Sequence, residues 1–304
     1  MVGQFAGKEA LGAVGSCTTA VSLFTGLLIG MGGGINAIAA RYEGAGDRVR
    51  IGKTVHSSLL ISLIYGFSIM VLGLLLIDKL LIVLKTKDEL LADAILYMRV
   101  YLLGTPALAI YNFGNGILSA AGDSKRPLYY LFAAGMVNIV LNLFFVVVLR
   151  MTVEGVAIAT VVSNAVSAAI LYNRLRKHSG DIHVELRKLC IDRRVLGQAL
   201  RIGVPAGVQS AMFSVSNIVI QAAVNTLGTT VMAASSAAFN VEVFAYYVMN
   251  GFTQACTTFV GQNYGAGQLT RCRKTLKLSM LEAAAALGAT IVLVLLSGHF
   301  LLSL

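Results

Sequence analysis

Long apolar stretches alternate with short polar loops along most of this chain. A helix that spans a bilayer needs about 20 consecutive, mostly apolar residues. Segments of that length and character lie at 14–40, 55–77, 94–120, 127–149, 154–174, 203–226, 231–260 and 276–302. The pattern therefore predicts an all-α integral membrane protein that crosses the bilayer many times.

One polar stretch, residues 176–201, is much longer than the other loops. It carries several clusters of basic residues, and Leu189, Leu196, Ala199 and Leu200 could form an apolar stripe on a helix lying on the inner leaflet. We expect it to be an amphipathic linker between an N-terminal lobe at 1–175 and a C-terminal lobe at 202–304.

Composition places the chain in lipid. Hydrophobic residues make up 57% of the 304 positions and charged residues only 12%, whereas a soluble domain carries about 25% charged residues. The net charge of +10 does not indicate nucleic acid, because the basic residues form no single patch. Most of the 24 Lys and Arg residues lie in loops at 41–54, 121–127, 174–201 and 262–277. By the positive-inside rule these loops are cytoplasmic, so we expect a multi-pass protein of the cell membrane.

The chain also contains an internal repeat, with an offset of 221 residues between Gly44-Ala45-Gly46 and Gly265-Ala266-Gly267. The matches continue downstream of both motifs and pair further residues upstream, including Gly7 with Gly228, Ala13 with Ala234, and Gly30 with Gly251. Repeats within apolar chains are typical of transporters. Shifted back by the offset, the helix at 203–226 would precede Met1, and three helices of the first lobe have no partner in the second. We therefore expect a two-lobed fold of six plus six helices, truncated at both ends, with helices two to nine present.

Several short motifs together resemble the multidrug and toxic compound extrusion (MATE) family. They occur in family order at Val2–Phe5, Gly122–Pro127, Asn138–Asn142, Arg201–Gly207 and Val260–Gln262, with the two Gly-Ala-Gly loops. The resemblance implies export of small organic, often cationic, compounds by antiport against protons or sodium ions. It implies no cofactor beyond the coupling ion, and we expect a monomer whose partners are its substrate and membrane lipids.

A lipid-linked saccharide flippase of the same wider superfamily is the alternative. Its cavity should be more cationic, and the few basic residues within the apolar segments favour the exporter.

The sequence contains no motif that supports an enzyme function. Residues 46–54 resemble a phosphate-binding loop but have the wrong spacing and follow no strand. The four cysteines lack metal-type spacing, so we expect free thiols and no metal site.

Glu242 is the one acidic residue that we place in the middle of an apolar segment. An ionisable residue inside a membrane is costly, and it usually marks an ion or substrate pathway. Facing an apolar cavity, its pKa should rise, so that proton uptake could displace a cationic substrate. The alternatives are a neutral, hydrogen-bonded packing residue and a carboxylate that reaches a polar cleft.

A set of amides and hydroxyls in the first lobe forms the second candidate site. Asn138 and Asn142 are four residues apart, so they share one helix face. Asn112 and Asn115 lie on the preceding apolar segment, and Thr160 on the following one. The resemblance places this region at the cation site of some MATE members, although some carry an aspartate where Asn142 stands. The alternative is hydrogen bonding that only holds helices together.

Three prolines and one acid are candidates for structural or gating roles. Pro106 and Pro205 should kink or open their helices. Asp123 should cap the helix that begins near Pro127, where proline suits the first turn. Capping and topology are the expected roles of this loop, with gating as the alternative.

Overall fold

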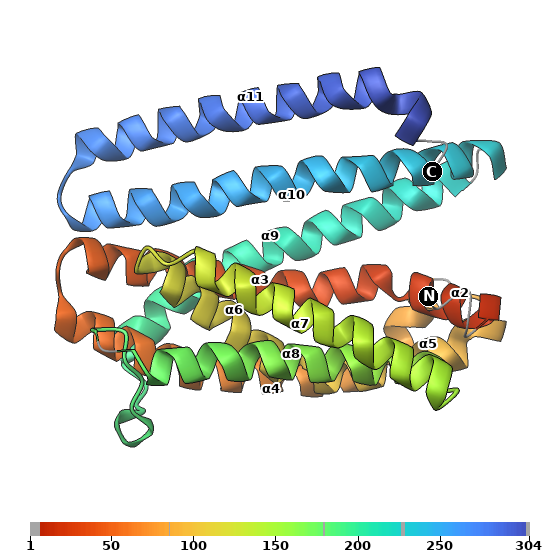
Figure 1. The fold of residues 1–304 in the computed structure, drawn as a ribbon, viewed down its shortest axis with the longest axis horizontal. Helices are drawn as coiled ribbons and strands as arrows, with labels where there is room; N and C mark the ends of the chain where they lie inside the picture. The colour runs from red at the N-terminus through yellow and green to blue at the C-terminus, as the bar shows by residue number, and fades with distance from the viewer. Residues whose placement is uncertain (1–6, 85, 179, 226–228, 302–304) are drawn as a thin grey trace. The chain divides into compact units, whose positions relative to one another are not determined.

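The computed structural model describes residues 7–84, 86–178, 180–225 and 229–301, and these ranges are mostly helical (Figure 1). The motif at Val2–Phe5 and the repeat position Gly228 lie outside the described residues. In chain order the elements are α2 (Gly7–Ser16), α3 (Thr18–Gly44), α4 (Arg48–Val83), α5 (Asp88–Leu103), α6 (Thr105–Ala120), α7 (Lys125–Leu143), the π-helix η1 (Phe144–Val148), α8 (Val153–Arg176), the 3₁₀ turn η2 (Leu186–Lys188), α9 (Arg193–Asn225), α10 (Thr229–Gly265) and α11 (Leu269–Leu301).

Each of the apolar segments expected from the sequence falls on a helix or on a pair of helices. Among the described residues, six helices are long and apolar enough to cross a membrane, and a bent pair could form a seventh span. Several helices extend beyond the apolar segment. For example, α4 begins at Arg48 because Asp47 caps it, accepting the Arg50 N–H at 3.0 Å. Hydropathy detects only the part of a helix that suits lipid, whereas the backbone hydrogen bonds continue into the polar region.

The segment at 94–120 is broken rather than continuous. α5 and α6 meet at Gly104 with a bend of 48°, and Pro106 lies in the first turn of α6, where its missing N–H is not needed. Thr105 holds the break by donating its hydroxyl to the Leu102 carbonyl at 2.7 Å. Pro205, for which we expected a similar effect, lies inside α9 without ending it.

The expected linker at 176–201 is only partly helical. α9 begins at Arg193, within the stretch that we assigned to the linker, because Asp192 accepts the N–H groups of Arg194 and Val195 at 2.9 and 3.3 Å. Val195 and Ala199 are buried. Of the expected stripe, Ala199 is buried, Leu189 and Leu196 are half-buried, and Leu200 is 44% exposed, so the stripe is not buried as a whole. The part of the linker before α9 is mostly irregular.

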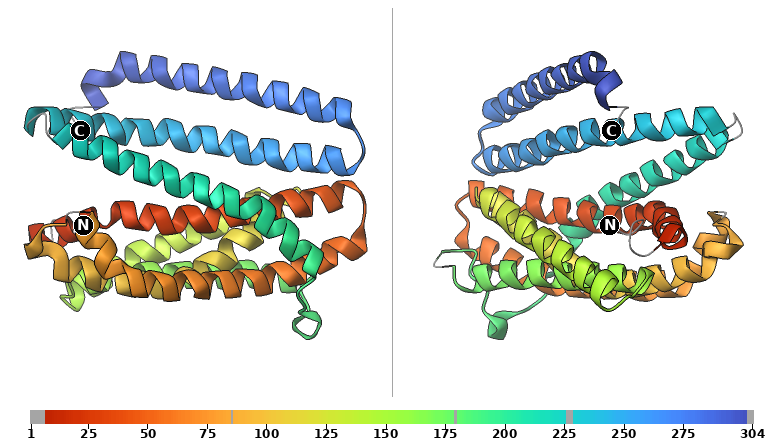
Figure 2. Two further views of the ribbon diagram at one scale, coloured as in Figure 1. Left: turned by 180° about the vertical axis from the view of Figure 1, so that it is seen from behind. Right: turned by 45° about the vertical axis from the view of Figure 1, so that its right-hand side comes forward.

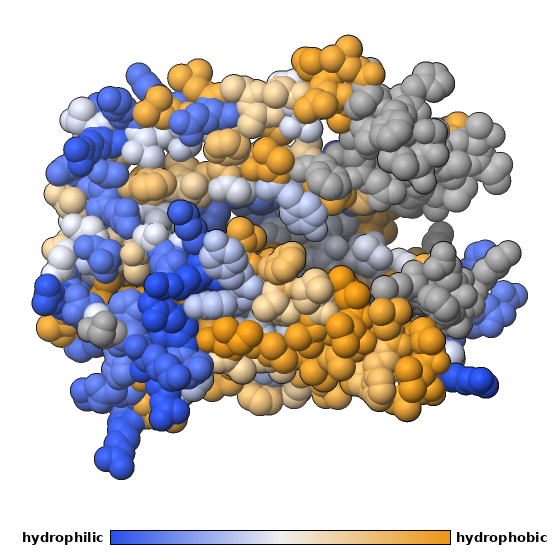
Figure 3. All heavy atoms as spheres, viewed as in Figure 1, coloured by the Kyte–Doolittle hydropathy of each residue, from blue (hydrophilic) through white to orange (hydrophobic). Residues whose placement is uncertain are grey.

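Contacts divide the chain into two compact units. Unit 1 comprises residues 1–39 and 47–215, and unit 2 comprises residues 40–46 and 216–304. In unit 1, α4 packs on α6 and α7 packs on α8, around fully buried side chains that include Leu28, Met98, Leu102 and Phe113. Many large apolar side chains of α7 and η1 are exposed, among them Leu128 and Phe132 of α7 and Phe144 of η1. Figure 3 shows hydrophobic side chains over α7 and hydrophilic ones gathered near the linker. That pattern suits a helix that faces lipid.

Small residues bring α3 and α9 into close contact within unit 1 (Figure 2). Gly30 lies against the backbone of Gly207, and Gly34 against that of Gly203. One turn earlier on α3, Gly26 faces Ser210. Small residues at four-residue spacing allow helix backbones to approach closely in membranes, where packing replaces the hydrophobic effect as the driving force.

The internal repeat is visible in the backbone. Gly46 and Gly267, which correspond at the offset of the repeat, have φ values of 65° and 72°. The N–H of Ala45 donates to the Arg41 carbonyl at 3.1 Å, and that of Ala266 donates to the Gln262 carbonyl at 3.0 Å. The two Gly-Ala-Gly loops are therefore the same helix-ending corner built twice.

Candidate functional site

Four polar side chains meet between α7 and α8, and we call them the α7–α8 polar cluster: Asn138, Asn142, Thr160 and Ser163. Asn138 donates its Nδ2 hydrogens to Ser163 Oγ at 3.3 Å and to Thr160 Oγ1 at 3.5 Å. Asn142 in turn donates from Nδ2 to Asn138 Oδ1 at 2.9 Å. The structure thus brings together three of the residues expected from the sequence. Ser163 was not anticipated, although its position three residues after Thr160 could have indicated a shared helix face.

The cluster contains an acceptor that the protein does not satisfy. Thr160 and Ser163 donate their own hydroxyls to backbone carbonyls of α8, at 3.0 Å to Val156 and 2.9 Å to Thr160. Asn142 Oδ1 is buried and has no hydrogen-bond partner among the described residues. Leaving a buried polar atom unpaired costs about 1–3 kcal/mol. The cluster therefore offers amide and hydroxyl oxygens, one of them free, to a cation or to a hydrogen-bond donor.

Asn112 and Asn115, the other two amides of the candidate site, make hydrogen bonds within α6. Asn112 donates to the Leu108 carbonyl of its own helix at 2.8 Å, and Asn115 accepts from Ser119 Oγ at 3.3 Å. Both bonds are local to α6. The sequence indicated that these amides lie on neighbouring helices. It did not indicate the direction in which each side chain points.

Glu242 lies within α10, in unit 2, and its side chain is exposed. The apolar enclosure that we expected around it is therefore not supplied by the described residues. Glu282 of α11 is also exposed. The two glutamates share residue type, unit and exposure but differ in position along their helices, which makes Glu282 a suitable control for Glu242.

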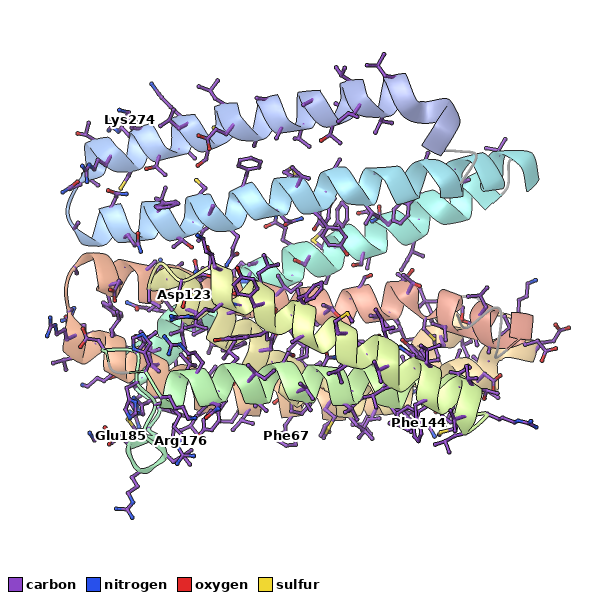
Figure 4. All side chains as sticks on the ribbon, in the orientation of Figure 1. Phe67, Asp123, Phe144, Arg176, Glu185 and Lys274 are labelled. Carbon is purple, nitrogen blue, oxygen red and sulfur yellow. The ribbon has the colours of Figure 1, made fainter. Side chains whose placement is uncertain are left out.

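The loop before α7 is organised by Asp123, which Figure 4 shows at the start of that helix. Asp123 accepts the Arg126 N–H at 3.2 Å and pairs with the Arg126 guanidinium at 2.9 Å. Pro127 is buried, and its carbonyl accepts the Tyr111 hydroxyl at 3.2 Å. Ser124, which occupies the N-cap position of α7, makes no side-chain cap bond. Asp123 therefore binds the first turn of α7 from one residue before the N-cap.

The linker before α9 is held against α4 by two side chains that the sequence did not single out. Ser57 donates to the Cys190 carbonyl at 3.0 Å and accepts the Asp192 N–H at 2.9 Å. His56 is buried. Its Nδ1 bonds the Gly52 carbonyl at 2.7 Å and must donate, whereas Nε2 accepts the Glu185 N–H at 3.0 Å. In the sequence, the only sign of this contact with the linker was a histidine beside a serine inside an apolar segment.

Electrostatics at this linker favour charged carboxylates. The N–H groups of Val195 and Arg194 lower the pKa of Asp192, with a smaller contribution from Lys53, whose ammonium lies 3.7 Å from the carboxylate. A hydrogen bond from Lys188 lowers the pKa of Glu185. For His178, partial burial and then the charges of Arg174 and Arg126 lower the pKa. Figure 4 shows Glu185 and Arg176 at this end of unit 1.

Comparison with known proteins identifies the family. The profile of the MatE family matches residues 1–144 and 205–304, which is most of the chain. The chain belongs to the MATE family. MATE proteins are membrane transporters and not enzymes, in agreement with the absence of catalytic motifs from the sequence.

Individual relatives agree with this assignment. The chain is 26% identical over 310 residues to the probable multidrug resistance protein YoeA of Bacillus subtilis, covering all of this chain and 67% of that protein. It is 27% identical over 281 residues to an FAD transporter of Shewanella oneidensis, covering 90% of this chain and 62% of that protein. The chain thus spans about two thirds of the length of the curated relatives that it matches.

Solved structures share the fold. The outward-facing conformation of a multidrug resistance MATE transporter matches with a TM-score of 0.84 at 25% identity, over 98% of this chain and 69% of that one. A transporter of the wider superfamily from Pyrococcus furiosus matches with a TM-score of 0.86 at 26% identity, over 96% of this chain and 65% of that one. The protein is therefore an all-helical, multi-pass membrane protein with the MATE fold.

Proposed function

We propose that this protein exports small organic molecules across the cell membrane in exchange for protons or sodium ions. The match of the MATE profile to most of the chain is the observation that carries the proposal. Two similar proteins are described as a probable multidrug resistance protein and a multidrug export protein. These descriptions favour a drug exporter over the lipid-linked saccharide flippase.

In this proposal the protein acts as a monomer, and its basic loops at 41–54, 121–127, 174–201 and 262–277 face the cytoplasm. The linker at 176–201 separates an N-terminal lobe at 1–175 from a C-terminal lobe at 202–304. The offset of the repeat supports this division, since equivalent corners lie on both sides of the linker.

The two candidate sites suit different coupling ions. The α7–α8 polar cluster has neutral oxygens only, and neutral oxygens can coordinate sodium but cannot hold a proton near neutral pH. Glu242 is a carboxylate and can exchange a proton for a cationic substrate. We propose that sodium coupling would use the cluster, through Asn142 Oδ1, and that proton coupling would use Glu242.

The test is efflux of a cationic dye from cells that express the protein. A protonophore that stops efflux supports proton coupling, and loss of efflux on removal of sodium supports sodium coupling. Efflux that neither treatment alters would contradict antiport altogether.

Two variants test whether Glu242 is the residue that couples efflux to protons. With proton coupling, Glu242→Gln should lower the rate of efflux at least tenfold, because the glutamine cannot take up a proton. Glu282→Gln is the control and should retain the rate of the parent. Equal efflux from Glu242→Gln and the parent would remove Glu242 from the mechanism.

A further inference from the structure

The two copies of the repeat touch each other inside unit 2. Gly44, at the end of α3, lies against the backbone of Gln262, and Gly265, at the end of α10, lies against the backbone of Arg41. The offset of 221 residues relates Gly44 to Gly265 and also relates Arg41 to Gln262. The contact is therefore reciprocal, as between the two halves of a two-fold symmetric interface.

Neither glycine leaves space for a side chain. A Cβ at Gly44 would meet the carbonyl oxygen of Gln262, and a Cβ at Gly265 would meet the carbonyl oxygen of Arg41. Both carbonyls already accept an N–H of their own helix end, from Ala266 and Ala45. Moving them aside would break those hydrogen bonds, so the approach of the two backbones depends on glycine.

One side-chain interaction joins the two copies as well. The guanidinium carbon of Arg41 lies 5.2 Å from the ring centre of Tyr264, within the range of a cation–π interaction. At the offset of the repeat, Gln262 corresponds to Arg41 and Glu43 corresponds to Tyr264. That reciprocal pair has neither a cation nor an aromatic ring, so the repeat offers the cation–π interaction only once. We call Arg41, Gly44, Gln262, Tyr264 and Gly265 the glycine clasp.

We propose that the glycine clasp is a releasable closure of the transport path at the end that carries the Gly-Ala-Gly loops. The inference rests on the proposed function. By sequence α3 belongs to the first lobe and α10 to the second, and an alternating-access transporter must part its two repeats on one side at a time. A contact between the last turns of these two helices must then break when that side opens.

The chemistry of the clasp suits repeated opening. The hydrogen bonds from Ala45 to Arg41 and from Ala266 to Gln262 each stay inside one copy, so they survive when the copies separate. Tyr264 is 52% exposed, so water reaches the ring before and after opening. Glycine-to-backbone contact provides a close fit without an interlocking side chain.

The test uses cysteine cross-linking in membranes, in a background with the four native cysteines replaced. Ala45 and Ala266 are exposed, equivalent positions beside the two glycines. With Ala45→Cys and Ala266→Cys, a short bifunctional thiol reagent should join the two corners. The linker is then cut by proteolysis near Arg187. The readout is whether the two resulting fragments stay joined in one cross-linked species.

Variants of the clasp should lower the cross-linked fraction several-fold. Gly44→Ala and Gly265→Ala test the backbone contact. Gly251→Ala is the control, because its added methyl group meets nothing within 4 Å, and it should cross-link like the parent. Arg41→Gln removes the cation–π interaction without adding bulk and should give an intermediate fraction. Unchanged cross-linking in both glycine variants would overturn the clasp.

Efflux of the dye by the same cells tests the gating role. Cross-linked protein should export at less than a tenth of the rate of the untreated protein, because its closure cannot open. Full efflux after cross-linking would show that the closure is not released during transport and would overturn the inference. Absence of efflux from the untreated parent would refute the proposed function and the gating role with it, whereas the cross-linking of the variants would still report whether the clasp forms.

Discussion

Asn142 donates from Nδ2 to Oδ1 of Asn138, one turn earlier on α7, at a distance of 2.9 Å. The two amides are nevertheless not equivalent. Asn138 uses both ends of its side chain, because its Nδ2 also donates to Ser163 and Thr160. Asn142 keeps a buried oxygen without a partner among the described residues. One amide therefore holds α7 to α8, and the other is left with capacity to bind.

This difference predicts unequal losses of stability when each amide is replaced. Asn138→Leu should lower the free energy of unfolding by about 1–3 kcal/mol, because it removes the hydrogen bonds of the cluster and leaves polar partners unpaired. Asn142→Leu should cost less, since it also removes the unpaired oxygen. Thermal unfolding in detergent measures both variants. If Asn142 Oδ1 binds sodium, added sodium should raise the midpoint of the parent but not that of Asn142→Leu. An equal loss in the two variants would contradict the asymmetry.

The packing of α3 on α9 predicts that neighbouring glycines differ in their tolerance of a methyl group. Gly30→Ala places its Cβ against the backbone of Gly207, and overpacking of this kind costs about 1–3 kcal/mol. Gly33→Ala on the same helix meets nothing within 4 Å. It should be neutral or stabilise by about 0.5–1 kcal/mol, because alanine favours the helix more than glycine does. Thermal midpoints of the two variants check this, and a destabilised Gly33→Ala would count against the described crossing.

Ser57 predicts a local effect on the linker. Ser57→Ala removes the hydrogen bonds to Cys190 and Asp192, so residues 180–192 should exchange their amide hydrogens several-fold faster while α4 keeps its protection. The control is Ser68→Ala. Ser68 is exposed on the same helix, and among the described residues its hydroxyl donates only to the Ile64 carbonyl. Hydrogen exchange that stays at the parent rate in Ser57→Ala would show that other contacts hold the linker.

The pKa of Asp192 predicts how the start of α9 responds to acid. Its folded-state pKa is lowered from 3.8 by the N–H groups that it caps. The stabilisation is therefore fully present above the ordinary carboxyl pKa and is lost as the pH falls through the lower folded value. Exchange of the Val195 and Leu196 amides, corrected for the intrinsic rate, should accelerate in that acidic range. Asp192→Asn keeps a capping oxygen and should abolish the pH response. A response that persists in Asp192→Asn would assign it to another group.

Much of the fold followed from local patterns. The apolar segments near 55–77 and 154–174 became α4 and α8, because helix formation and burial in lipid both depend on residues close in sequence. Helix ends were less predictable. α9 starts at Arg193 because Asp192 caps it there, and a capping residue inside a polar stretch does not stand out by hydropathy.

The candidate site was predictable only in part. Asn138 and Asn142 share a face because of their spacing, and the sequence indicated as much. Thr160 and Ser163 join them through the crossing of α7 and α8, whereas Asn112 turns back to its own helix. Side-chain direction depends on the neighbouring helix, and a single apolar segment carries no information on that neighbour.

The sequence by itself determined the membrane class, the helical segments, the repeat and the resemblance to the MATE family, because each depends on composition or spacing along the chain. Only the tertiary structure decided that Asn142 has an unpaired oxygen, that Ser57 holds the linker and that Gly44 and Gly265 each lie against the opposite copy of the repeat. Those contacts join residues far apart in sequence. They depend on the angle and distance at which two helices cross, which the packing of many side chains sets together.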